Sequence, residues 1–330
     1  MMKVLGMGNA LVDVLAIIDN DETLDRLNLP KGSMQLIDEK RFHELSKEIN
    51  KLNTTIVSGG SAANTIVGLA CVEVETGFIG RVGNDSFGDL YRQDLIRYGV
   101  NPLLSTVEET SGVATTFISK DGERTFGTYL GAAALLTPED LQEGMFEGYD
   151  YFYIEGYLVQ NYDLIRTAMK LAKKAGLKVI LDFASYNVVE GSRDFLLEII
   201  PELVDIIFAN EEEAKAMYHQ DITPEEAVSK LAAITEIAIV KAGNCGSWIQ
   251  KGDNKVLVSA NPVKRIDSTG AGDLYAAGFI YGLTHNMPLL ECGNIGTLLA
   301  EHVIQVIGPK IEEQQWATIK ETLKPATVKV

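Results

Sequence analysis

The second half of the chain alternates short apolar runs with helical patterns, and this alternation constrains the fold more than any other feature. From about Tyr149 onward, runs rich in β-branched and aromatic residues are separated by segments whose apolar residues repeat with helical spacing. The expected strands are 151–154, 179–181 and 206–208, and the expected helices are 162–175 and 193–200. Because helices connect successive strands, the pattern predicts βαβ units on a parallel sheet and an α/β fold class.

Residues at the helix ends support this interpretation. Gly176 follows the Lys-rich end of one helical segment, as is typical of a helix C-terminus. Thr137 before Pro138, and Thr223 before Pro224, are typical of an N-cap followed by proline at the first helical position. We therefore expect helices to begin at both prolines.

The first half of the chain is mixed. Its expected elements are a strand at 4–7 and helices at 61–72 and 87–98. Residues 11–37 and 112–130 alternate like strands without intervening helices, and the second segment reverses at 120–123, where Asp-Gly favours a tight turn. We interpret both segments as a small β-sheet that projects from a single α/β domain spanning 1–330. Such an appendage could serve as a lid over a cleft or as an oligomer contact.

Charge and cysteine content exclude several classes of function. Among 330 residues, 46 are acidic and 29 are basic, so the formal net charge is −17. This charge repels nucleic acid and anionic lipid surfaces, and we expect the chain to bind neither. Three cysteines (Cys71, Cys245 and Cys292) without CxxC spacing indicate a reducing compartment. With no apolar run near the ~18 residues of a spanning helix, the sequence predicts a cytoplasmic protein.

The common sequence motifs for nucleotide and metal binding are incomplete or absent. Gly6 and Gly8 follow a strand, but the third glycine of a GxGxxG fingerprint would fall at Leu11, and this argues against a nicotinamide-dependent oxidoreductase. The sequence contains no GxxxxGK[ST], HExxH or GxSxG motif, and its four histidines lack metal-binding spacing.

The string DSTGAGD at 267–273 is a glycine-rich turn that leads into an apolar helical segment. We expect the backbone amides of Gly270, Ala271 and Gly272 to be unpaired at the helix start and to form an anion hole. Asp273 would lie in the first helical turn, ionised and able to accept a proton from an attacking hydroxyl. The alternative is that the glycines only make a turn and that Asp273 only caps the helix.

This string resembles the signature of the ribokinase (PfkB) family of carbohydrate and nucleoside kinases. Four further segments match the family in the expected order, over roughly residues 4–310. They are GNALVD at 8–13, SGGSAAN at 58–64 with GRVGNDSFG at 80–88, NEEE at 210–213, and KAGNCG at 241–246. The resemblance implies a ribokinase-like three-layer αβα fold with a mainly parallel central sheet and a small β-sheet lid.

The resemblance also implies an acceptor site. In the family, a Gly-Gly pair lets the backbone meet the acceptor's hydroxyl groups and an Asn hydrogen-bonds them, which corresponds here to Gly59, Gly60 and Asn64. Asn9 and Asp13 are similar to the family's substrate-binding pair, in which a carboxylate accepts hydrogen bonds from two vicinal hydroxyls. The competing interpretations are a plain strand-to-helix turn for the glycines and a surface carboxylate for Asp13.

Other matching residues are implied to bind ATP and magnesium, namely Asn210, Glu213, Lys241, Gly243, Gly246 and Asp267. The i, i+3 spacing predicts Asn210 and Glu213 on one helical face at the carboxyl edge of the sheet. In the family this pair positions magnesium, so Glu213 would act through water. Lys241 belongs to a nucleotide-side loop, and Asp267 would order its loop or help to bind a monovalent cation such as K⁺.

Within the family, segments 6–13, 110–114, 129–133 and 153–157 are most similar to adenosine kinases. A purine needs an apolar or aromatic slot. Candidates that could equally be core residues are Leu15, Met34, Phe117, Tyr157, Leu158 and Tyr186. Leu158 stands where adenosine kinases tend to place a stacking aromatic residue, which leaves a free sugar such as ribose or fructose open as the acceptor.

The predicted reaction is transfer of the ATP γ-phosphoryl group to a primary hydroxyl, the 5′-hydroxyl for adenosine. Asp273 would be the base, and the 270–272 amides would stabilise the transferring group. The alternatives are a sugar kinase of ribokinase or fructokinase type and a non-catalytic purine or sugar sensor on the same fold. The expected partner is a small-molecule nucleoside or sugar, and the chain would be a monomer or a homodimer.

Overall fold

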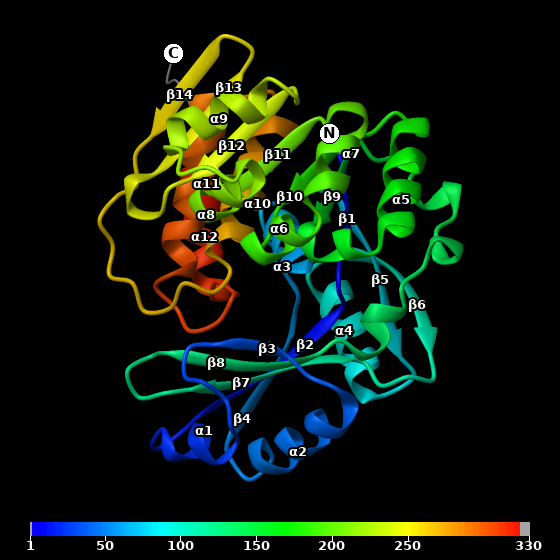
Figure 1. Cartoon of the computed structure of the whole chain (residues 1–330), viewed down its shortest axis with the longest axis vertical. Helices are drawn as coiled ribbons and strands as arrows, with labels where there is room; N and C mark the ends of the chain where they lie inside the picture. The colour runs from blue at the N-terminus through cyan, green and yellow to red at the C-terminus, as the bar shows by residue number, and fades with distance from the viewer. Residues whose placement is uncertain (1, 324–330) are drawn as a thin grey trace.

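The computed structural model describes residues 2–323, and a nine-stranded sheet forms its centre (Figure 1). The strand order is β14-β13-β12-β11-β10-β9-β1-β5-β6, parallel from β12 to β6 and antiparallel at β13 and β14. The bounds are β1 (Val4–Met7), β5 (Thr76–Gly83), β6 (Val100–Val107), β9 (Tyr151–Glu155), β10 (Lys178–Asp182), β11 (Ile206–Asn210), β12 (Ile237–Lys241), β13 (Ser247–Lys251) and β14 (Asn254–Val258). The predicted α/β fold class with a mainly parallel sheet is confirmed.

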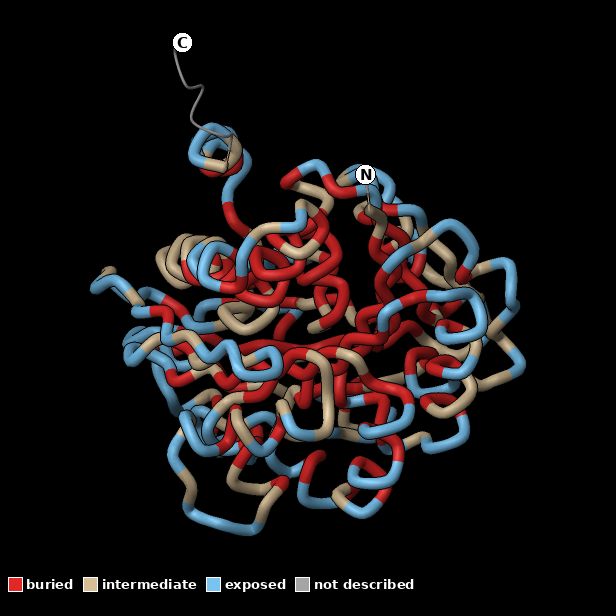
Figure 2. Tube along the Cα trace, turned by 90° about the horizontal axis from the view of Figure 1, so that it is seen from above, coloured by how far each residue is buried: buried red, intermediate tan, exposed pale blue. Residues whose placement is uncertain are grey.

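Helices cover both faces of this sheet. On one face lie α3 (Ser61–Cys71), α4 (Ser86–Arg97), α10 (Ala271–Thr284), α11 (Leu289–Val303) and α12 (Glu313–Leu323). On the other lie α5 (Tyr162–Lys174), α6 (Tyr186–Gly191), α7 (Arg193–Leu203), α8 (Glu211–Tyr218) and α9 (Pro224–Ala232). Viewed from above, buried chain runs through the middle of the molecule and exposed chain surrounds it (Figure 2). No helix within residues 2–323 has the length and apolar character needed to cross a membrane.

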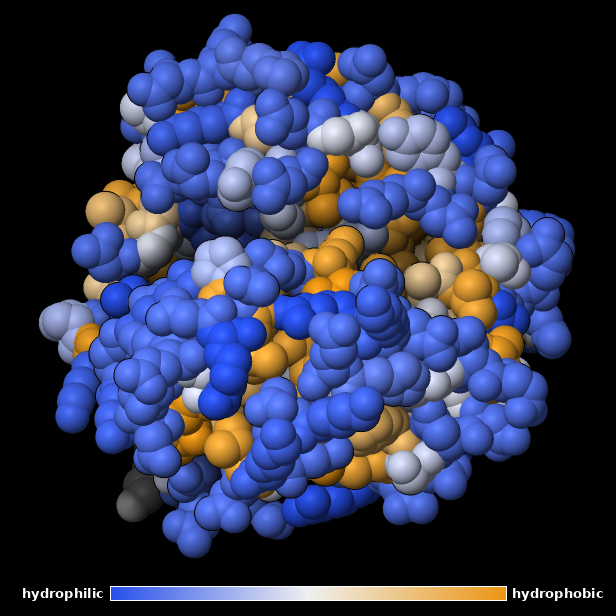
Figure 3. All heavy atoms as spheres, turned by 60° about the horizontal axis from the view of Figure 1, so that its bottom comes forward, coloured by the Kyte–Doolittle hydropathy of each residue, from blue (hydrophilic) through white to orange (hydrophobic). Residues whose placement is uncertain are grey.

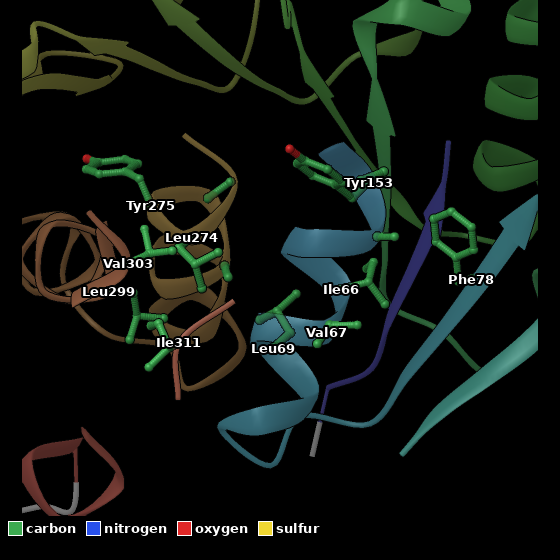
Figure 4. Close-up of a cluster of buried hydrophobic side chains, with 14 of the residues drawn as sticks. Ile66, Val67, Leu69, Phe78, Tyr153, Leu274, Tyr275, Leu299, Val303 and Ile311 are labelled. Atoms are coloured by element: carbon green, nitrogen blue, oxygen red, sulfur yellow. The ribbon is translucent and has the colours of Figure 1, made fainter. Parts of the chain in front are cut away.

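Side chains that alternate along the strands pack into two separate cores, one on each face of the sheet. On β9, Tyr153 packs into the core beneath α3 and α10, whereas Phe152 and Ile154 pack into the core beneath α5 and α7. Figure 4 shows α3 and α10 side by side, with apolar side chains such as Leu69 and Leu274 packed around them. Since a parallel sheet is buried on both faces, its strands are apolar throughout, which explains why the sequence pattern located them.

A second, five-stranded sheet, here called the small sheet, lies at the lower end of Figure 1. Its order is β3-β8-β7-β2-β4, with β2 (Leu11–Ile17), β3 (Met34–Leu36), β4 (Thr54–Gly59), β7 (Gly112–Ile118) and β8 (Arg124–Tyr129). It carries α1 (Glu22–Arg26) and α2 (Glu39–Ile49). The expectation that 11–37 is all strand is wrong, because α1 interrupts it. β4 was not predicted, since its antiparallel pairing with β2 is a long-range contact.

Short 3₁₀ segments complete the fold. They are η1 (Gly131–Leu135), η2 (Pro138–Asp140), η3 (Glu143–Met145), η4 (Gly156–Gln160) and η5 (Gly243–Cys245). Thr223 does cap α9, and Gly176 follows α5 with a φ of +85°. Thr137 forms a capping box, but only three 3₁₀ residues follow it. The predicted helix at Pro138 is therefore wrong, because a cap satisfies only the first turn and a longer helix needs further packing.

Candidate active site

Helix α10 begins directly after Gly270, at the turn that the sequence predicts to be an anion hole. Gly270 has a φ of +77°, which favours glycine. Within residues 2–323, the amides of Gly270 and Gly272 donate no hydrogen bond to a backbone carbonyl. The Ala271 amide, in contrast, donates to the Ser268 carbonyl at 3.2 Å. The expectation of three unpaired amides is thus wrong for Ala271, because the tight turn brings that carbonyl back to it. Two amides remain open to an anion.

Asp273 lies in the first turn of α10 and faces the start of α3. Its Oδ1 accepts a hydrogen bond from Ser61 Oγ at 2.7 Å, and its Oδ2 accepts one from Asn64 Nδ2 at 2.9 Å. Burial raises the pKa of Asp273 to about 6, while these two hydrogen bonds act to lower it. The carboxylate is therefore mainly ionised at neutral pH and held in one orientation. Sequence reasoning missed Ser61, although it lies inside the SGGSAAN segment, and it assigned Asn64 to the acceptor rather than to Asp273.

Asp13 lies on β2 against the glycine pair. A Cβ built on Gly59 would fall 2.4 Å from Asp13 Oδ2, and one built on Gly60 would fall 2.4 Å from the Asn9 carbonyl oxygen. Gly60 also has a φ of +92°. The pair is therefore required by the close approach of Asp13 and Asn9. Burial raises the pKa of Asp13 to about 7, and the nearby positive charge of Arg124 acts in the opposite direction.

Asn9 is held by Glu155, a residue that sequence reasoning did not single out as functional. The backbone N–H and the Nδ2 of Asn9 both donate to Glu155 Oε1 at 2.8 Å, and the Ala62 amide donates to Oε2 at 2.8 Å. Glu155 is only 1% exposed, and burial raises its pKa to about 7. This carboxyl group fixes the chain after β1 against the start of α3, and the available signals were its place at the end of a predicted strand and within the 153–157 segment.

Asn210 and Glu213 lie at the carboxyl edge of the central sheet and bind one another. The Asn210 N–H and Nδ2 donate to the Glu213 carboxylate at 2.8 and 2.7 Å, and the Glu213 N–H donates to Asn210 Oδ1 at 2.9 Å. Asn210 is thus the N-cap of α8 and lies before the helix, so the expected shared helical face is wrong. Burial raises the pKa of Glu213 to about 7, and the charge of Lys241 opposes this shift.

The remaining residues expected on the nucleotide side are Lys241, Gly243 and Gly246, which lie at the end of β12 and in the loop before β13. Lys241 ends β12 and pairs in register with Asn210, so it lies beside the Asn-x-x-Glu pair. Gly243 is exposed in η5. A Cβ on Gly246 would lie 1.9 Å from the Val258 carbonyl oxygen, so the β13–β14 hairpin alone accounts for this glycine.

Asp267 orders the turn before α10. Its Oδ1 accepts from the Thr269 N–H at 3.0 Å and from Thr269 Oγ1 at 2.9 Å, and its Oδ2 accepts from the Gly308 N–H at 2.7 Å. Arg124 of β8 forms a buried ion pair with the same carboxylate. Asp267 therefore orders its loop, which is one of the two roles expected for it, and binding of a monovalent cation stays a prediction. The ion pair joins the small sheet to the anion-hole loop.

A cavity of about 490 Å³ is lined by Asn9, Ser61 and Glu155 among others, whereas Asp13 and Asp273 are not part of its lining. Three of the six predicted purine-slot residues line it, namely Met34, Tyr157 and Leu158. Of the others, Leu15 and Phe117 are buried within the small sheet, and Tyr186 is half-exposed and outside the lining. Met34 and Leu36 of β3 line the cavity. Figure 3 shows hydrophobic side chains among the hydrophilic surface with the lower end of the molecule brought forward. The small sheet therefore forms one wall of the cavity.

Comparison with known proteins agrees with this geometry. The family model of the pfkB family carbohydrate kinases matches residues 32–316. The chain belongs to this family. A probable sugar kinase from Rhizobium etli CFN 42 is 33% identical, with a TM-score of 0.88 over 97% of this chain and 98% of that one. The adenosine kinase from Sinorhizobium meliloti is also 33% identical, with a TM-score of 0.87 over 97% and 99%. A 5-dehydro-2-deoxygluconokinase from Clostridium perfringens is 29% identical over 81% of this chain and 83% of its own.

This pfkB-family protein is a sugar or nucleoside kinase, which transfers a phosphoryl group to a hydroxyl. Kinases of the family use ATP and Mg²⁺. Across residues 2–323, no three His, Cys, Asp or Glu side chains form a metal-binding cluster. Both oxygens of Glu213 accept hydrogen bonds from Asn210, so magnesium that arrives with a nucleotide would meet this carboxylate through water, because Mg²⁺ keeps several waters and binds mainly through substrate phosphates. The residues present therefore fit the metal.

Proposed function

We propose that this kinase transfers the γ-phosphoryl group of ATP to the 5′-hydroxyl of adenosine. The observation that supports this most is the cavity lined by Ser61, the hydrogen-bond partner of Asp273, because part of its wall is apolar and contains the ring of Tyr157. A purine gains affinity from such a surface, whereas a free sugar does not need it. Tyr157 is 37% exposed, and its hydroxyl donates to the Ala184 carbonyl at 3.3 Å, which fixes the ring. This tyrosine could supply the stacking aromatic that Leu158 does not.

The residues of the site have separate tasks in this reaction. Asp13 accepts hydrogen bonds from the ribose hydroxyls. Asp273 accepts the proton of the 5′-hydroxyl while the oxygen of that hydroxyl forms a bond to Pγ. The bond from Pγ to the bridging oxygen of ADP breaks in the same step. The open amides of Gly270 and Gly272 donate to the transferring group. Magnesium held with Glu213 through water would neutralise phosphate charge.

A free sugar is the second candidate acceptor. Polar residues also line the cavity, namely Gln160, Asn161, Ser185 and Asn187, and these could bind the extra hydroxyls of a sugar. The similarity to a 5-dehydro-2-deoxygluconokinase supports a sugar acceptor, as the similarity to an adenosine kinase supports adenosine. The two candidates share the base and the anion hole, so only the acceptor distinguishes them.

The deciding experiment measures ADP release from Mg-ATP with adenosine, other nucleosides, ribose, fructose and 5-dehydro-2-deoxygluconate as single acceptors. Asp273→Asn should abolish turnover. Asp163→Asn, which changes an exposed carboxylate in the first turn of α5, is the matched control and should retain it. Turnover with a sugar alone would refute adenosine as the acceptor. Binding of purine or sugar without ADP release would favour the sensor alternative.

We also propose a cytoplasmic location. Cys71, Cys245 and Cys292 are all free thiols, and free thiols persist in reducing compartments. Sedimentation of the purified protein would distinguish a monomer from a homodimer.

A further inference from the structure

An ion pair crosses the carboxyl edge of the central sheet beside the predicted phosphate site. Asp182 ends β10 and Lys241 ends β12, and β11 lies between these two strands. The Lys241 Nζ lies 3.1 Å from Asp182 Oδ2 and 5.9 Å from the centroid of the Phe208 ring on β11. The pair therefore bridges the middle strand above Phe208.

This pair is buried and further anchored. The side chains of Lys241 and Asp182 are 17% and 5% exposed. Asp182 Oδ1 accepts from the Ala184 N–H at 3.0 Å, and its Oδ2 accepts from the Tyr153 hydroxyl at 3.4 Å. Burial disfavours the charged form of Lys241, but the nearby carboxylates outweigh it and raise its pKa, so the ammonium stays protonated. A buried ion pair seldom stabilises a fold more than apolar packing would, so its position suggests a functional reason.

The ammonium faces the first turn of α10. A Cβ built on Gly272 would lie 3.2 Å from Lys241 Nζ, which places the charge next to an open amide of the anion hole. The acidic groups close enough to act on it electrostatically are Asp182, Glu213 and Asp273. An ammonium has three N–H donors, and the contact with Asp182 uses one of them. The others can face the anion hole.

Building on the proposed function, we propose that Lys241 is a catalytic residue that donates hydrogen bonds to the transferring phosphoryl group, and that Asp182 is its positioning residue. Lys241 stays protonated throughout, and the proton of the acceptor hydroxyl goes to Asp273. Asp182 holds the ammonium on the anion-hole side, so that Lys241 does not pair with the Asp273 carboxylate and block the base. This role differs from phosphate binding by the glycine turn, because Lys241 places a fixed positive charge beside the phosphoryl group, whose negative charge is redistributed during transfer.

Steady-state kinetics and nucleotide binding test the assignment together. Lys241→Met should lower kcat about 10²- to 10³-fold, as the loss of one preorganised donor does, with little change in KM for the acceptor. For Lys241→Met, calorimetry should show that the affinity for the non-hydrolysable analogue Mg-AMP-PNP, relative to the affinity for Mg-ADP, is lower than in the wild-type protein. Lys241→Arg should restore part of both effects. The matched control is Lys178→Met, which removes an exposed ion pair with Glu236 at the other end of β10 and should behave as wild type.

A double-mutant cycle isolates the role of Asp182. Asp182→Asn should lower kcat in the wild-type background but have no further effect in Lys241→Met, because it acts only through that lysine. The double variant removes both buried charges, so it keeps the test available if Lys241→Met alone does not fold. Equal effects of Asp182→Asn in both backgrounds would overturn the positioning role.

The outcomes separate this inference from the proposed function. If the wild-type protein binds both nucleotides and Lys241→Met matches Lys178→Met in kcat and in the ratio of the two affinities, only the role of Lys241 is refuted. If wild type turns over no acceptor, the affinity ratio still decides the role of Lys241. If wild type binds neither nucleotide, both proposals fail.

Discussion

Replacing Gly60 with alanine is expected to destabilise the protein more than replacing Gly99, although both glycines have positive φ angles, +92° and +81°. The backbone conformation alone costs a residue with a Cβ of the order of 1–3 kcal/mol. A Cβ at Gly99 meets nothing within 4 Å, so that variant should show only this cost. A Cβ at Gly60 would fall 2.4 Å from the Asn9 carbonyl oxygen, and because this contact is backbone, the chain must move. Overpacking of this kind adds about 1–3 kcal/mol.

Urea unfolding of the two variants measures the difference. We expect Gly60→Ala to lose about 2–6 kcal/mol of unfolding free energy and Gly99→Ala about 1–3 kcal/mol. Because the displaced residue is Asn9, Gly60→Ala should also raise KM for the acceptor, whereas Gly99→Ala should not. Equal losses of stability, or an unchanged KM in Gly60→Ala, would show that the close approach of Gly60 to Asn9 does not shape the acceptor site.

Three further predictions follow from the site. The rate should fall about tenfold per pH unit below about pH 6, because the raised pKa of Asp273 leaves the base protonated there; a pH–rate profile checks this, and a flat profile contradicts it. Arg124→Met should cost about 3–5 kcal/mol in urea unfolding, because it leaves Asp267 buried without its partner. Lys174→Met, which removes an exposed pair, should cost under about 1 kcal/mol, and similar losses would refute the argument. Tyr157→Leu should raise KM for adenosine more than for ribose, and an equal effect on both would exclude stacking on this ring.

Sequence patterns located β1, β9, β10 and β11 of the nine-stranded central sheet and several of the helices that cover it, but not β5, β6, β13 or β14. The expected strand at 206–208 is β11, and the expected helix at 162–175 is α5, which the structure ends at Lys174. The helices are buried on one face and the strands on both, so the spacing of apolar residues within a single segment identifies each element. The small sheet was harder, because β4 is exposed over its first residues and forms only by pairing with β2.

Side-chain partners within the site were the least predictable feature. Asn64 and Asp273 are 209 residues apart in the chain, and each appears in its own motif with no sign that they bind one another. Glu155 and Asp182 were hidden at the ends of apolar strands. The Asn-x-x-Glu spacing led us to expect Asn210 and Glu213 on one helical face, but the same spacing also produces the capping box that the structure shows.

The amino-acid sequence by itself determined the α/β architecture, the glycine turn before α10 and the presence of Asp273 in the first turn of that helix, because each depends on neighbouring residues. Only the tertiary structure decided what these groups contact. It placed Ser61 and Asn64 on Asp273, Glu155 on Asn9, and Lys241 beside Asp182. The physical reason is that parallel strands bring their carboxyl ends to one edge, so residues far apart in sequence become neighbours only after the sheet has formed.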